Sequence, residues 1–162
     1  MALGDFTLLR EGQFGVAGAE RYAVASGAAA SIKAGEPVGK ALGAAAVATL
    51  ATNKPVVGTD YIAGISSTTS TDTVAAAGVV DVIPVNSEQV WLCAPAVAAT
   101  WDTQAKYDAL VGDRVLLDKT GGVYTVLAAD GATNGCVVRP LDIAKYPGKV
   151  AISFRDGCNY LA

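Results

Sequence analysis

The 162-residue chain contains no histidine, so the commonest general base of enzymes is absent and carboxylates would have to carry any acid–base chemistry. Most of the candidate aspartates stand beside a glycine or at the end of a predicted strand: Asp81, Asp113, Asp118, Asp130, Asp142 and Asp156. Turn geometry favours aspartate at such positions. We therefore predict that these carboxylates cap turns, and that the chain is not an enzyme.

Nucleophile and metal chemistry have no better support. Cys93, Cys136 and Cys158 lie far apart, form no C-x-x-C pair and have no histidine to complete a zinc site. Because free cysteine behaves as a small hydrophobic residue, we predict three buried thiols. Asp102 and Asp108, six residues apart on a predicted helix, point to different sides and make no metal clamp.

Glycine and tryptophan patterns leave one ligand hypothesis open. The stretch GQFGVAG, residues 12–18, matches neither the dinucleotide fingerprint nor the P-loop, so no cofactor is predicted. Trp91 and Trp101 flank LCAPAVAAT and could stack on a sugar, although paired tryptophans of this kind are more typical of a core. A carbohydrate-binding module using either ring with an aspartate therefore remains an alternative.

The composition describes a chain of small apolar side chains. Hydrophobic residues make up 52% and the mean hydropathy is +0.38, but the longest weakly polar run, residues 41–51, is about half of a bilayer span. The net charge of −3 and singly spread lysines and arginines argue against nucleic acid as a partner. The first residues carry no apolar signal core, which favours synthesis in the cytoplasm and no membrane partner.

After Pro55 the pattern is that of successive strands. Runs rich in β-branched residues, bounded by turn residues, predict strands at residues 61–66, 78–85, 88–95, 114–118, 123–127, 136–141 and 149–155. The sequence VNSEQ predicts that 78–85 and 88–95 form a hairpin. The polar run at 67–73 is expected to be a solvent-facing loop or an edge strand.

One helix and one tight hairpin are signalled locally. Asp102 or Thr103 is a good N-cap, and Gly112 can end the helix with a positive φ. The paired glycines of KTGG suit the hairpin between residues 114–118 and 123–127. The predicted fold is mainly β, a small antiparallel β-barrel or sandwich with one short helix, preceded by an extended Ala/Gly-rich N-terminal region.

The N-terminal third differs from the rest. Residues 1–26 carry isolated apolar side chains between glycines and charges, a pattern typical of an arm laid on another surface. Residues 27–52 are either two weak helices or loosely packed strands. The helical interpretation of residues 38–51 depends on the propensity of alanine, which Gly39 and Gly43 oppose. We divide the chain into an N-terminal arm and Ala/Gly-rich segment at 1–54 and a β-rich domain at 55–162.

The order of these elements resembles a known family. The segments IAGIS, AGVVDVIPV, VWLCAP, DTQAKYDALVGDRVLLDKTGGVYTVL and VAISFR, spread over residues 57–155, are similar in arrangement to the small capsid decoration, or cement, proteins of tailed bacteriophages. The long Ala/Gly-rich N-terminal third departs from that family.

The resemblance implies a virion structural protein rather than an enzyme. It would bind the outside of a phage capsid after synthesis in the host cytoplasm, as a homo-oligomer and commonly a trimer, and clamp neighbouring major capsid subunits. The apolar residues of the arm would then contact the partner: Phe6, Leu8, Leu9 and Phe14. A phage tail-tube or head–tail adaptor protein is the alternative within virion proteins.

Overall fold

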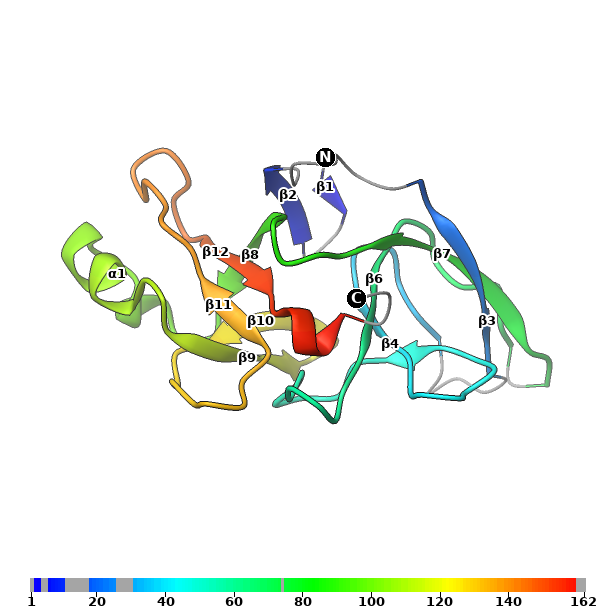
Figure 1. Ribbon diagram of the computed structural model, residues 1–162. Helices are drawn as coiled ribbons and strands as arrows, with labels where there is room; N and C mark the ends of the chain where they lie inside the picture. Colours follow the sequence, from blue (N-terminus) through cyan, green and yellow to red (C-terminus); the bar gives the residue numbers. More distant parts are fainter. Residues whose placement is uncertain (1, 4–5, 11–17, 26–30, 74, 160–162) are drawn as a thin grey trace.

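The computed structural model describes residues 2–3, 6–10, 18–25, 31–73 and 75–159. The prediction of a mainly β fold with one short α-helix is confirmed in these residues. Two sheets lie side by side, with α1 at the far end of the larger sheet and β3 at the far end of the smaller one (Figure 1). The N-terminal Ala/Gly-rich region contributes strands to both of them.

The larger sheet has seven strands and is ring-like. Its strands are β1 (Ala2–Leu3), β2 (Phe6–Arg10), β8 (Val90–Pro95), β10 (Val123–Leu127), β9 (Arg114–Thr120), β11 (Cys136–Val138) and β12 (Val150–Phe154). The ring closes because β8 pairs with β12 as well as with β10. All its pairs are antiparallel except β8 with β10, whose parallel pairing departs from the predicted all-antiparallel sheet.

The smaller sheet has five strands in the order β3 (Glu20–Val24), β7 (Gly78–Pro84), β6 (Ile62–Ser66), β4 (Pro37–Gly39) and β5 (Ala48–Thr49). A parallel bridge between Val24 and Val47 joins its two ends. Three of its strands precede residue 54 and two follow it, so strand pairing runs across the predicted boundary between the two segments.

The polar run at residues 67–73 lies along β7 as a loop. Ser67 N donates to Asp81 O and Thr71 N to Val79 O. The hydroxyls of Thr68 and Thr71 accept hydrogen bonds from Asp81 N and Val79 N, both at 3.0 Å. The side chains of this loop therefore satisfy backbone donors that a further strand would otherwise meet.

Two apolar clusters meet at β6 and β7. Ile62, Ile65 and Ile83 belong to the cluster that fills the larger sheet. Ala63 and Val82 belong to the cluster inside the smaller sheet. All five residues of β6 are buried, because each face of the strand is covered by a different core.

A glycine is required at position 64, where β6 pairs with β7. A Cβ at this position would lie 2.0 Å from the carbonyl oxygen of Ile83 and 2.6 Å from its carbonyl carbon. Only a residue without a side chain allows the two backbones to approach this closely.

The helix and the hairpin follow their predicted signals. Thr103 accepts a hydrogen bond from Lys106 N at the start of α1 (Gln104–Leu110), and Gly112 follows the helix with φ +94°. Gly121 and Gly122 have φ values of +61° and +81° between β9 and β10. Within the described residues, no helix combines the length and the apolar character needed to cross a lipid bilayer.

Tyr107 fastens α1 to the larger sheet. Its hydroxyl donates to Arg139 O at 3.0 Å and accepts from Ala151 N at 2.8 Å, while its ring packs 5.5 Å from Trp101. Burial raises the pKa of Tyr107 to about 12.

The predicted hairpin of residues 78–85 and 88–95 is wrong. The turn itself exists, since Gln89 N donates to Asn86 Oδ1 at 2.9 Å and Asn86 N to Gln89 Oε1 at 3.1 Å. After it the strands separate: β7 pairs with β3 and β6, whereas β8 pairs with β2, β10 and β12. Both strands are largely buried, so each needs a sheet of its own.

The helical alternative for residues 38–51 is also wrong. β4 and β5 pair with each other and are connected by turns, with Gly43 at φ +75°. Val38 and Val47 are buried in the smaller core, and that tertiary burial outweighs the helix propensity of the alanines.

Substituting alanine for Gly64 should destabilise the protein by about 3 kcal/mol, because the methyl group meets backbone atoms that cannot move without separating β6 from β7. Urea unfolding followed by circular dichroism measures this. Gly18→Ala is the matched control, since nothing lies within 4 Å of its Cβ, and it should change stability by less than about 0.5 kcal/mol. Equal stabilities for the two variants would contradict the packing at Gly64.

Tyr107→Phe should cost about 1 to 3 kcal/mol, because Ala151 N and Arg139 O lose their partner in a buried site. The unfolded tyrosine ionises near pH 10 and the folded one only near pH 12, so its contribution is complete below pH 10 and declines between pH 10 and 12. Urea unfolding at pH 8 and pH 11, with Tyr61→Phe as control, should show a smaller difference from wild type at pH 11 for Tyr107→Phe. A difference that grows with pH would contradict this assignment.

Candidate functional site

The structure does not bring the predicted aspartates together. Asp130 accepts from Arg114 N at 2.9 Å and pairs with its guanidinium at 3.3 Å. Asp142 accepts from Ala144 N at 3.0 Å, as expected of a turn residue, and Asp156 opens the short 3-10 helix η3 (Asp156–Cys158). For Asp142 the predicted turn role is confirmed, whereas Asp130 accepts its hydrogen bonds from Arg114 on β9.

Asp81 and Asp118 lie in strands instead. Asp81 pairs with Arg21 on the neighbouring strand β3 at 2.9 Å, and this hydrogen bond lowers the pKa of Asp81. Asp118 accepts from Thr52 and from Thr120, and these hydrogen bonds lower its pKa. A carboxyl group held ionised in this way is a poor general acid near neutral pH. Asp113 is half-buried, with its backbone N–H donating to Leu110 O.

Asp102 and Asp108 make separate contacts at the helix, as predicted. Asp102 pairs with Lys106 at 2.7 Å, and Asp108 accepts from Gln104 Nε2 at 2.7 Å. Among the described residues, no group of three or more cysteine, aspartate and glutamate side chains is placed to hold a metal ion.

The three cysteines are buried thiols, as predicted. Burial raises the pKa of Cys136 well above its ordinary value, and nearby Cys158 and Cys93 add to the effect. Burial raises the pKa of Cys158 to about 11. Because the thiolate is the reactive species, these side chains are suited to packing rather than to nucleophilic attack.

Both tryptophans are core residues. Trp91 is fully buried and Trp101 is 5% exposed, so neither ring offers a face to a sugar. The interpretation of the pair as core residues is confirmed. The carbohydrate-binding alternative loses the stacking surface that it required.

The predicted partner-binding residues of the arm lie against the chain's own core. Phe6 is 0% exposed and packs with Phe154, the ring centroids being 6.3 Å apart. Leu8 and Leu9 are half-buried against the same cluster, and β2 pairs with β8. Phe14 lies outside the described residues. In this conformation Phe6 has no surface to present to a partner.

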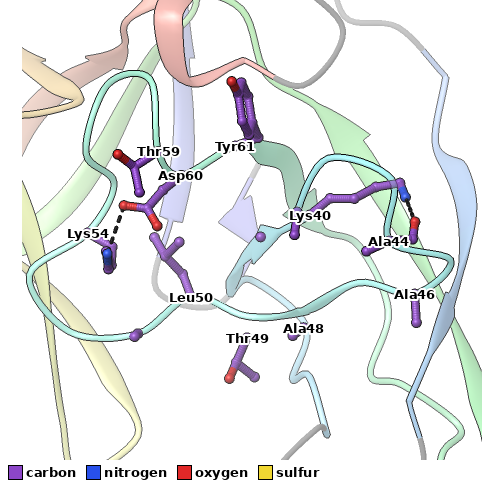
Figure 2. Close-up of a pocket in the computed structure, with 13 residues that line it drawn as sticks. Lys40, Ala44, Ala46, Ala48, Thr49, Leu50, Lys54, Thr59, Asp60 and Tyr61 are labelled. Atoms are coloured by element: carbon purple, nitrogen blue, oxygen red, sulfur yellow. Dashed lines mark hydrogen bonds and ion pairs between the residues drawn. The ribbon is translucent and has the colours of Figure 1, made fainter.

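A hollow of about 420 Å³ lies beside β4 and β5 (Figure 2). Its wall includes five alanines and Leu50. Lys40 Nζ donates to Ala44 O, and Lys54 pairs with Asp60 at 3.0 Å. The charged groups drawn in Figure 2 are thus engaged within the chain, and the hollow brings together no acid–base or nucleophile pair beyond that one ion pair.

The outer side of β10 carries an apolar surface that the sequence analysis missed. The register places Val123, Thr125 and Leu127 of β10 on one side together with Thr120, Asp118 and Leu116 of β9, while Tyr124 and Val126 face the core. Val123 is exposed and Leu116 and Leu127 are half-buried, and Asp118 and Thr120 add a polar part to this side. We call this side, together with the loop at residues 96–99, the β10 surface.

The loop at 96–99 extends this surface. Ala96 N donates to Val126 O, which holds the loop beside the end of β10. Val97 is 60% exposed and Val123 is 47% exposed. The signal was present in VYTVL, where apolar residues occupy both alternating positions of one strand.

Comparison with protein-family models, with curated proteins and with solved structures finds no match. The function proposed below therefore depends on the residues and geometry of this chain.

In the native protein the thiols should react with Ellman's reagent far more slowly than in guanidinium, where all three should be titrated. For Cys158, the rise in pKa from 9.0 to about 11 alone reduces the thiolate fraction about a hundredfold at pH 8. Absorbance at 412 nm measures the rate. Rapid labelling of any one thiol in the native protein would show that the burial is wrong.

Proposed function

We propose that the chain is a virion structural protein that binds the outer surface of a phage capsid and cements neighbouring major capsid subunits. The observation that carries this proposal is the β10 surface, where Val123 at the start of β10 and Val97 in the adjoining loop remain exposed. Exposed apolar side chains gathered on one face are typical of a contact surface between proteins. Tail-tube or adaptor proteins also present such surfaces, but no feature of this chain favours them specifically.

The positions of the reactive side chains support a binding role rather than catalysis. Within the described residues, the thiols and indoles are buried and the aspartates face separate partners. A surface built from valine, leucine and alanine gains free energy from apolar area, at roughly 25 cal/mol per Å². That gain is modest for one small patch, so cementing requires many copies.

Repetition supplies the remaining affinity. A homo-oligomer, which we propose to be a trimer, would present several such surfaces at once, and avidity would then exceed the affinity of each. Binding to assembled shells but not to free subunits would stabilise the shell by linkage. The proposed location is the virion surface, with the major capsid protein and further copies of this chain as partners.

The β10 surface can be tested with two matched substitutions. Val97→Asp combined with Val123→Asp should reduce binding to expanded capsids lacking this protein by at least about tenfold, because each carboxylate must be desolvated at the contact. Leu42→Asp, at a residue 69% exposed beside the smaller sheet, should leave binding unchanged. Co-sedimentation with the capsids measures the bound fraction.

The proposed capsid location and cementing role can be tested by separate measurements. Mass spectrometry of purified virions should give hundreds of copies per particle, and capsids with the bound protein should retain DNA to a higher temperature than capsids without it. A handful or a dozen copies would assign the protein to the portal or tail instead. Equal DNA release with and without the protein would rule out cementing.

A further inference from the structure

Two arginines on the outer side of β11 and β12 differ from the other arginines whose side chains are described. Arg21 pairs with Asp81 and Arg114 with Asp130. Arg139 and Arg155 have no carboxylate partner in the part of the chain that the structure describes. Both are half-buried, and in a protein of net charge −3 two uncompensated cations on one side of a sheet need an explanation.

The strand register places the two arginines on the same side of the extended β11–β12 ladder, Arg139 opposite Ala151 and Arg155 opposite Gly135. Arg139 N donates to Ala151 O and Arg155 N to Gly135 O, which continues the β11–β12 ladder beyond its ends. Ser153 lies between them, two residues before Arg155, and accepts from Arg139 Nε at 2.7 Å. The two arginines and Ser153 line one hollow of about 290 Å³, together with Ser87 and Asp156.

Arg139 is held in place by two of its five donors. Its Nε donates to Ser153 Oγ, and its Nη2 donates to Ser87 O at 3.3 Å. Ser153 is only 1% exposed, so this anchor is buried and fixed. Nη1 and one hydrogen of Nη2 remain for a ligand, because neither makes another hydrogen bond within the described residues.

Arg155 leaves its bidentate edge open. Its Nη1 donates to Ala132 O and to Asn134 O, both at 2.9 Å. These bonds fix the plane of the guanidinium, and Nε and Nη2, which lie along one edge, make no hydrogen bond to the described residues. Two parallel N–H groups on one edge match the spacing of two carboxylate oxygens.

We propose that Arg139 and Arg155 form a binding site for a carboxylate group, which Arg155 holds through Nε and Nη2 and Arg139 contacts through Nη1. The anchored groups are arranged before the ligand arrives, so little side-chain entropy is lost on binding. This site does not depend on the capsid proposal, since a small carboxylic acid or an acidic side chain of any protein would satisfy it.

The charge of the hollow favours a carboxylate over phosphate. Asp156 lines the same hollow and is exposed, which leaves one net positive charge from the two arginines. A singly charged carboxylate balances that charge, whereas a phosphate near −2 would be repelled by Asp156. The hollow also lacks the stripe of lysines and arginines that a nucleic-acid backbone requires.

The test is a titration of the intact protein with sodium acetate, followed through the arginine Nε–Hε signals in ¹H–¹⁵N spectra, with sodium chloride at equal ionic strength as reference. Acetate should shift the signals of Arg155 and Arg139 along a saturating curve, while those of Arg21 and Arg114 stay unchanged. Blocked Gly-Glu-Gly should act like acetate. Inorganic phosphate should bind more weakly than acetate at pH 7.5.

Three variants test whether Arg155 binds acetate. Arg155→Gln should weaken acetate binding at least about tenfold, and Arg155→Lys, which keeps the charge but loses the fork, should fall between it and wild type. Arg114→Gln, at an arginine already paired with Asp130, should bind acetate like wild type.

The dispersion of the amide spectrum shows whether each variant is folded. If Arg155→Gln does not fold, Arg155→Lys and the wild-type titration decide. No saturating shift at Arg155, tighter binding of phosphate than of acetate, or equal loss in Arg114→Gln would each overturn the proposal. None of these results would bear on binding to capsids, which is measured separately on the β10 surface.

Discussion

The structure depends on the close approach of β6 to β7. At Gly64 the two backbones come so near that a single added carbon would overlap the carbonyl of Ile83. This pair of strands serves two cores at once, since Ile62, Ile65 and Ile83 belong to the larger core and Ala63, Val80 and Val82 to the smaller one.

The two cores also determine where the reactive side chains lie. The ring formed by β8, β10, β9, β11 and β12 encloses the indole of Trp91 and the thiol of Cys136, and Tyr107 closes its end through two hydrogen bonds. Two groups of side chains outside this ring carry the proposals made above. One is the β10 surface, and the other is the pair of arginines that follow β11 and β12.

Local signals predicted local structure well. The Thr103 cap, the end of α1 at Gly112 and the glycine hairpin between β9 and β10 each depend on residues within a few positions of one another. The hairpin predicted for residues 78–95 failed for a different reason. Its turn forms through Asn86 and Gln89, but which strands pair after a turn is decided by burial across the whole chain. The predicted partner-binding residues failed for a similar reason. Phe6 is apolar whether it packs on a partner or on the chain's own core, so the sequence does not distinguish the two.

The sequence by itself determined the mainly β class, the short helix α1, the buried thiols and tryptophans and the turn role of Asp142. Composition, propensity and spacing are sufficient for such properties. Only the tertiary structure decided that β7 and β8 separate into two sheets, that the N-terminal strands complete both sheets, and that Arg139 and Arg155 share one hollow. Those outcomes depend on contacts between residues far apart in the chain, and a one-dimensional pattern does not specify which distant strands meet.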